Sequence, residues 1–169
     1  QVDEYNHIVR WQLGYGDHFP EKGERLLNIR NTCLMLPSGE VAQFLNGDFL
    51  RVKDVKCDTF SLEGYYRPKG SQDVYRFPCV WRKMKVNWVY DENRNLDSEI
   101  WVNVSPIVSD EWNAHPEYAS VGLYNGLKNY IEGELKRTGR LAGRDDVKAE
   151  LKQNQFLHAP IVKFGYAVT

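Results

Sequence analysis

Aromatic and basic residues alternate in three short segments near the middle of the chain, at residues 65–69, 75–77 and 80–85. Single-stranded nucleic acid is held by base stacking on aromatic rings, worth about 1–3 kcal/mol per base, and by phosphate contacts to Lys and Arg. The alternative is an ordinary sheet with a solvated basic face, and the pattern alone leaves both open. The side chains that we expect to contact a strand are Tyr66, Arg67, Lys69, Arg76, Trp81, Arg82, Lys83 and Lys85.

The remaining reactive residues form no catalytic or metal-binding pattern. The histidines are scattered, and the cysteines, Cys33, Cys57 and Cys79, are odd in number and form no CxxC pair, so we expect buried thiols. The sequence contains no GxxxxGK[ST] loop, and residues 139–143 lack the Lys-Ser/Thr pair that binds phosphate and metal. We therefore expect no catalytic residue, no metal site and no cofactor in this chain.

Composition does not mark the chain as a nucleic-acid-binding protein. The net charge is −1 and 27% of the residues are charged, so any such function depends on local patches. No apolar run approaches 18 residues and no signal-peptide pattern opens the chain. We expect no membrane association and a cytoplasmic location.

The elements that must position these segments are mainly strands. Residues 49–55 and 60–66 alternate between apolar and polar types, and residues 99–108 form a further strand. In residues 74–90 the alternation places Met84, Val86, Trp88 and Tyr90 on one face, and Lys83, Lys85 and Asn87 on the other. Five or six such strands in about 85 residues indicate a small antiparallel barrel.

Helical patterns flank this strand region. Residues 3–13 carry apolar residues at helical spacing, and so do residues 118–139. Residues 144–154 predict a polar helix, with Asp145 and Asp146 in its first turn, and a strand follows Pro160. The fold class predicted is mixed α/β and mainly β.

Residues 44–52 (Phe-Leu-Asn-Gly-Asp-Phe-Leu-Arg-Val) form the sharpest local motif. Asn-Gly and Gly-Asp favour positive φ, so the motif alone indicates a tight turn that leads into a strand.

Several short motifs occur in one order along the chain: Pro-Glu-Lys-Gly-Glu-Arg-Leu at 20–26, Ile-Arg-Asn at 29–31, the motif at 44–52, and Phe-Gly-Tyr-Ala-Val-Thr at 164–169. This order resembles the C-terminal region of RecD-like superfamily 1 DNA helicases, the group that includes exodeoxyribonuclease V alpha subunits. Glu24 stands where the family usually has Asp, and residues 59–108 match nothing in the family residue by residue. The matching residues are Asn6, Gly23, Arg25, Arg30, Asn31, Asn46, Gly47, Asp48, Gly165, Tyr166, Ala167 and Thr169.

The resemblance implies three segments: a helical remnant of the second RecA-like motor domain at 1–17, an inserted SH3-like barrel at 18–110, and helices with a terminal strand that return to the motor domain at 111–169. The chain would then be a piece of a longer DNA-repair enzyme, and a His-Lys-x-Gln-Gly motif would follow Thr169. ATP and magnesium are implied for the parent enzyme, and single-stranded DNA and the other helicase domains are implied as partners. The alternative is a barrel that docks a partner subunit without touching DNA.

Overall fold

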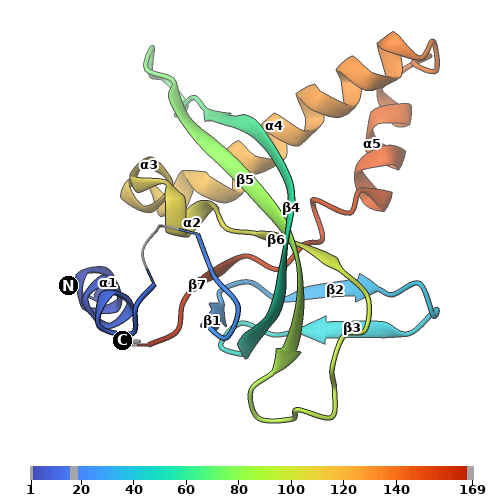
Figure 1. Cartoon of the computed structure of the whole chain (residues 1–169). Coiled ribbons are helices and arrows are strands. Elements are labelled where there is room, and N and C mark those ends of the chain that lie inside the picture. The colour runs from blue at the N-terminus through green and yellow to red at the C-terminus, as the bar shows by residue number, and fades with distance from the viewer. Residues whose placement is uncertain (1, 16–18, 167–169) are drawn as a thin grey trace.

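The computed structural model describes residues 2–15 and 19–166, and within them the chain is mixed α/β with a mainly antiparallel sheet (Figure 1). This confirms the coarse fold class. Five strands form one sheet in the order β6-β5-β4-β1-β7, and β2 pairs with β3 in a separate two-stranded sheet. The elements are α1 (Val2–Gln12), β1 (Arg25–Asn28), β2 (Thr32–Met35), β3 (Val41–Phe44), β4 (Phe49–Tyr66), β5 (Tyr75–Trp88), β6 (Ile100–Asn103), α2 (Ser105–Val108), α3 (Asp110–Ala114), α4 (Pro116–Arg137), α5 (Arg144–Gln153) and β7 (Val162–Phe164).

The five-stranded sheet is open, so the closed barrel expected from the sequence is not formed by the described residues. The two ends of the sheet approach each other at one point, where a single parallel bridge joins Asn103 at the end of β6 to Ile161 just before β7. The Asn103 N–H donates to the Pro160 carbonyl at 2.7 Å, but no ladder extends this contact. The terminal strand β7 instead pairs antiparallel with β1.

Strands β4 and β5 form a long hairpin at the centre of the fold, and its end extends beyond the rest of the sheet (Figure 1). The strands contain 18 and 14 residues, and their pairing shifts register twice in β4, between Val52 and Asp54 and between Val55 and Thr59. Such bulges increase the local twist of a strand. The hairpin therefore presents different faces to its neighbours in its lower and upper halves.

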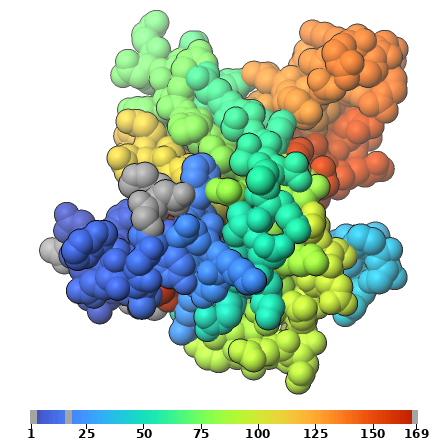
Figure 2. All heavy atoms as spheres, viewed as in Figure 1, coloured from blue at the N-terminus to red at the C-terminus, as the bar shows by residue number. Residues whose placement is uncertain are grey.

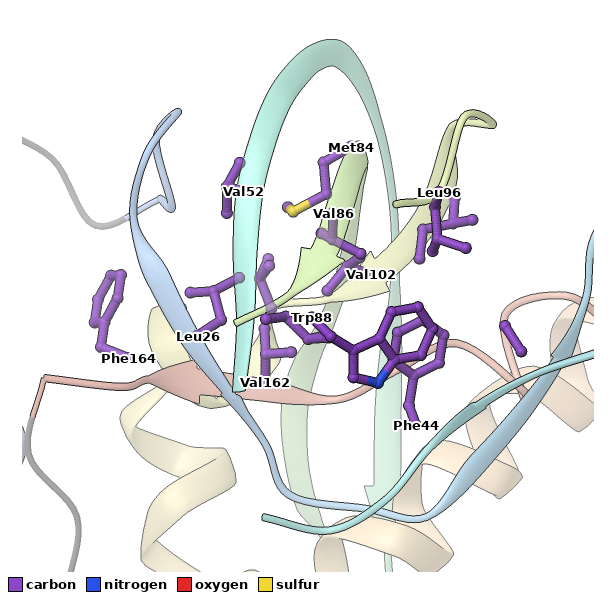
Figure 3. Packing of buried hydrophobic residues seen from close by; sticks show 14 residues of the cluster. Leu26, Phe44, Val52, Met84, Val86, Trp88, Leu96, Val102, Val162 and Phe164 are labelled. Atoms are coloured by element: carbon purple, nitrogen blue, oxygen red, sulfur yellow. The ribbon is translucent and has the colours of Figure 1, made fainter. Parts of the chain in front are cut away.

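The lower half of the hairpin covers a first hydrophobic core, formed with β1, β3, β6 and β7 (Figure 3). Met84, Val86 and Trp88 of β5 are buried in it, as the alternation predicts, and Trp88 stacks on Phe44 with ring centroids 4.8 Å apart. The prediction was wrong for Tyr90, which lies beyond the end of β5 and is 79% exposed.

The upper half of the hairpin packs its opposite face on a second core beneath α3, α4 and α5. Phe77, Cys79 and Trp81, the odd-numbered residues of β5, point into this core. Lys83 and Lys85 share that parity and are partly exposed, whereas Asn87, which the alternation places on the same face, is only 4% exposed.

Helix α4 lies close against β4 because it carries glycine at the contact. A Cβ atom on Gly126 would lie 2.6 Å from Leu62 Cδ1 and 2.7 Å from the Glu63 carbonyl oxygen, which is closer than packed atoms approach. The Asn125 side chain fixes the register by donating to the Tyr65 carbonyl at 2.9 Å. These contacts set the beginning of α4 beside the upper end of the hairpin.

The short helices α2 and α3 were not expected, because residues 99–108 were interpreted as one strand. That strand ends at Asn103, whose side-chain oxygen accepts from the Ser105 N–H at 2.9 Å. Ser109 caps α3 by accepting from the Trp112 N–H at 3.1 Å. Such local caps favour helix starts at the expense of strand continuation.

Candidate nucleic-acid interface

The end of the β4–β5 hairpin carries a stack of aromatic rings shared with the start of α4. Tyr66 at the end of β4 stacks on Tyr118 of α4, with centroids 4.3 Å apart and planes 17° from parallel. Tyr75 at the start of β5 stacks on Tyr118 with centroids 5.2 Å apart, and its ring is tilted by 44° against His115 at 4.3 Å. All four rings are partly exposed, so the stack forms an aromatic surface at the tip of the hairpin.

Two of the predicted cationic residues follow this stack along the chain, and a third, Arg76, lies at the same end of the hairpin with its side chain on the opposite face, because it alternates with Tyr75 along β5. Arg67 and Lys69 are exposed in the loop that follows Tyr66, and neither forms an ion pair within the described part of the chain. Arg76 follows Tyr75 and pairs with Glu63 across the hairpin at 2.7 Å. Because that pair is well exposed, it contributes little stability and leaves Arg76 able to exchange Glu63 for a phosphate. We call Tyr66, Tyr75, His115 and Tyr118 with Arg67, Lys69 and Arg76 the hairpin-tip cluster.

The phenol of Tyr118 stays protonated at neutral pH. Desolvation within the stack, and next the negative charge of Glu117, raise the pKa of Tyr118 above its ordinary value. The ring thus brings no negative charge that would repel a phosphate.

Trp81 must be removed from the predicted stacking residues. Its side chain is 0% exposed in the second core, and its indole N–H donates to the Phe156 carbonyl at 3.1 Å. The ring also packs against Phe60 and Phe156 at 5.4 and 5.3 Å. A base cannot reach it without opening the core, so Trp81 is a core residue.

The other predicted cations lie away from the tip and on two faces of the hairpin. Arg82 lies over the Phe19 ring at 5.0 Å and donates to the Lys56 carbonyl. The Lys83 ammonium lies over the Trp101 ring at 5.0 Å on the opposite face, which Lys85 shares by parity. At about 3.3 Å per residue, Lys83 is roughly 23 Å along β5 from Arg76. The structure therefore places Tyr66, Arg67, Lys69 and Arg76 at one end of the hairpin, with Arg76 on the face opposite to Tyr66, and separates them from Arg82, Lys83 and Lys85.

The motif residues at the two ends of the sequence meet around a buried ion pair. Arg10 of α1 and Glu24, just before β1, have side chains 2% and 0% exposed, and two hydrogen bonds of 2.5 and 2.8 Å join them. The Tyr166 hydroxyl also donates to Glu24 at 2.8 Å. Desolvation, followed by this hydrogen bond, raises the pKa of Tyr166. Asn6 adds a hydrogen bond to the Phe164 carbonyl at 3.3 Å.

The motif at residues 44–52 forms the predicted tight turn, between β3 and β4. Gly47 has φ of 98°, a value that side-chain-bearing residues rarely adopt, so the predicted backbone conformation is confirmed. Asp48 accepts from the Leu45 N–H at 2.8 Å, and Asn31 accepts from the Asn46 N–H at 2.6 Å. The first bond lies within the turn, and the second ties the turn to the segment that follows β1.

The remaining motif residues also hold strands together. Arg30 donates to the Leu157 and Ala159 carbonyls and so fixes the segment that leads into β7. Arg25 lies over the Phe49 ring at 3.8 Å. Gly23 has φ of 93° and donates its N–H to the Val52 carbonyl at 2.8 Å, while the Gly165 N–H donates to the Arg25 main-chain carbonyl at 2.9 Å. Ala167 and Thr169 lie outside the described residues.

The expectation of three buried thiols was wrong for two of them. Cys33 and Cys57 are exposed because they lie on outward positions of β2 and β4. Only Cys79 is buried, and its burial raises the pKa of the thiol to about 12. Among residues 2–15 and 19–166 no cluster of three or more His, Cys, Asp or Glu side chains could hold a metal ion. Nor does this part of the chain contain a helix with the length and apolar character needed to cross a bilayer.

Sequence reasoning missed Tyr75, His115 and Tyr118 as members of the site. Tyr75 belongs to one of the aromatic and basic segments but was not selected, and Tyr118 fitted the apolar stripe of a helix. No local signal in the sequence could have joined Tyr118 to Tyr66, because they meet only through the packing of α4 on β4.

No protein-family model matches this sequence, and no curated protein matches it. We therefore infer function from the residues and their arrangement.

Proposed function

We propose that this chain is part of a RecD-like DNA helicase or exonuclease subunit, and that its hairpin tip helps to hold single-stranded DNA during translocation. In this proposal the open sheet takes the place of the inserted SH3-like barrel, and α1 and β7 lead into the second RecA-like motor domain. ATP and magnesium act in other parts of the cytoplasmic enzyme. The chain itself contributes binding and no catalytic residue.

The hairpin-tip cluster is the observation that carries the DNA-binding part of the proposal. Stacked, partly exposed Tyr66, Tyr75 and Tyr118 offer a surface to which bases can add, since every base has a flat π-face. Arg67 and Lys69 follow Tyr66 in the loop and form no ion pair with the residues that the structure describes, which suits contact with phosphates.

The buried contact between Glu24 and Tyr166 supports the resemblance. These residues belong to two motifs at opposite ends of the sequence, and they meet where β1 pairs with β7. Short motifs that assemble into one hydrogen-bonded unit are better explained by a shared architecture than by separate coincidences. The motor domains themselves remain part of the proposal.

Binding of a fluorescent thymidine oligonucleotide to Tyr66→Ala tests this function. Loss of one stacking ring should weaken binding by about 1–3 kcal/mol per base, or roughly five- to 150-fold. The control is Tyr5→Ala on α1, which removes an exposed ring far along the chain from the tip. Equal affinities of Tyr66→Ala, Tyr5→Ala and the unchanged protein would remove the tip from the DNA path.

A partner-docking function is the second candidate, and the outer face of α1 favours it. Tyr5, Ile8 and Trp11 are 55%, 56% and 78% exposed on one side of this helix, whose other side holds Asn6 and Arg10 in the interior. Figure 2 shows α1 (blue) at the outside of the molecule. A row of large apolar side chains on a surface helix is typical of a protein contact. If this is the chain's only role, Trp11→Ala weakens subunit association while no oligonucleotide binds.

A further inference from the structure

Helices α4 and α5 border a groove that the proposed function does not use. The two helices and the loop between them line this open groove, which has a volume of about 660 Å³. In Figure 2 the end of α4 and helix α5 (orange to red) lie apart from the hairpin end (green), although α4 begins beside it. The volume is in the range of ligand-binding sites, about 300–1,000 Å³.

The groove has an apolar floor and an aromatic wall. Val147 and Leu151 of α5 form the floor together with Leu141 of the preceding loop. Tyr124 of α4 is 40% exposed on the opposite wall. An apolar side chain inserted here would exchange water for contact with these residues.

The rims of the groove carry unbalanced positive charge. Lys128 on α4 and Arg144 and Lys148 on α5 line it, and none of them forms an ion pair among the described residues. The carboxylate of Glu132, which also lines the groove, is engaged by Lys136 at 3.1 Å. The groove therefore favours an occupant with negative charges on both sides of an apolar centre.

The start of α5 is not available to a phosphate. The Asp146 carboxylate lies there and accepts from the Ala142 and Gly143 N–H groups, which precede the helix, at 2.7 and 3.0 Å. A phosphate would have to approach that carboxylate without gaining these donors. Carboxylates of a bound partner that pair with the rim side chains would be repelled by Asp146 less than a phosphate would be, because each carries a single charge and they can be spread along the groove.

The spacing of the rim residues matches a helix. Arg144 and Lys148 are one turn apart on α5, and Tyr124 and Lys128 are one turn apart on α4. Acidic side chains one turn apart, about 5–6 Å, would face each rim in register.

We propose that the α4–α5 groove binds an acidic amphipathic helix of a partner protein. Leucine-like side chains at i, i+3, i+4 and i+7 of that helix pack on the floor, as in other helix-in-groove complexes. Glu or Asp residues that flank this stripe pair with Lys128, Arg144 and Lys148. This surface is separate from the hairpin tip, so it binds a protein and DNA at once.

The test uses a labelled synthetic helix of about four turns that carries a Leu stripe flanked by Glu, with a scrambled peptide of equal composition. Fluorescence anisotropy measures binding to the unchanged protein, to Lys128→Glu/Lys148→Glu and to the charge-matched control Lys53→Glu/Lys152→Glu. Lys53 and Lys152 are exposed and do not line the groove, so their reversal should leave the affinity unchanged. Reversal of both rim charges should weaken binding about tenfold or more.

A peptide with Lys in place of Glu should bind the reversed variant better than the unchanged protein, a rescue that misfolding cannot produce. Equal binding of the scrambled peptide, or no binding of the Leu–Glu helix, would overturn the proposal. The proposal would also be overturned if Lys128→Glu/Lys148→Glu weakened binding of a thymidine oligonucleotide but not of the Leu–Glu peptide, because the groove would then hold nucleic acid. Tyr66→Ala should not alter peptide binding, so failure at the groove and failure at the hairpin tip are separable.

Discussion

At the scale of single residues, the chain contains a buried ion pair between Arg10 and Glu24. Arg10 and Glu24 join α1 to β1, and Tyr166 adds the end of β7 to the same carboxylate. A buried ion pair adds little net stability over an apolar replacement, but loss of one partner is costly because the other charge stays buried. From the sequence, Glu24 was noted only as the residue that replaces the usual Asp of a motif. Arg10 was not singled out, because nothing in the local sequence distinguishes a buried Arg from an exposed one on a short helix.

Replacement of Glu24 by Gln should lower the free energy of unfolding by about 3 kcal/mol, since it removes the charge that faces Arg10. Urea denaturation measures the difference. Glu40→Gln, at an exposed position, should stay within about 0.5 kcal/mol of the unchanged protein. A loss below about 1 kcal/mol for Glu24→Gln would contradict a structural role for the pair.

The three thiols should differ in reactivity. Burial raises the pKa of Cys79 to about 12, so almost none of it is thiolate at pH 8, and its sulfur is also shielded from reagents. Alkylation of the folded protein at pH 8 should therefore modify Cys33 and Cys57 and spare Cys79 until denaturant is added. Mass spectrometry of the peptides measures the alkylated fraction of each cysteine. Rapid labelling of Cys79 in the folded protein would contradict its burial and show that the second core opens readily.

At the scale of elements, the β4–β5 hairpin separates two cores by using both of its faces. The alternation of β5 revealed Met84 and Trp88, because strand periodicity is a local property. The continuity of β4 was missed, since its two register shifts interrupt the alternation between Asp54 and Thr59. Placement of α4 depends on Gly126, whose missing side chain matters only once β4 is beside it.

Two glycines of α4 should respond oppositely to alanine. Gly126→Ala should destabilise the fold by about 1–3 kcal/mol, because the new methyl group meets Leu62 and the Glu63 backbone. Gly133→Ala, with open space at its Cβ position, should stabilise by about 0.5–1 kcal/mol through helix propensity. Thermal unfolding of both variants measures this contrast, and equal effects would mean that α4 does not lie against β4 as described.

At the scale of the whole molecule, the sequence was sufficient for the fold class and insufficient for the site. Residues 65–69 and 75–77 were each selected for their composition, and the structure joins them through one hairpin, whereas Trp81 was assigned to the surface although it faces the core. The stack on Tyr118 depends on a contact between distant segments, which no short pattern encodes. The open sheet likewise depends on how β7 and β6 meet, at the single bridge of Ile161 and Asn103.

The salt dependence of oligonucleotide binding tests the central claim, DNA contact at the hairpin tip, most directly. Affinity of a thymidine oligonucleotide is measured at several salt concentrations for the unchanged protein, for Arg67→Ala/Lys69→Ala, and for the charge-matched control Lys53→Ala/Lys152→Ala, whose lysines are exposed elsewhere. Each lost phosphate contact should reduce the slope of log affinity against log salt by about 0.7, so the tip variant should bind more weakly with a slope shallower by about 1.4. The control should keep both affinity and slope. A folded tip variant with unchanged affinity and slope would contradict the claim and leave partner docking as the function of this chain.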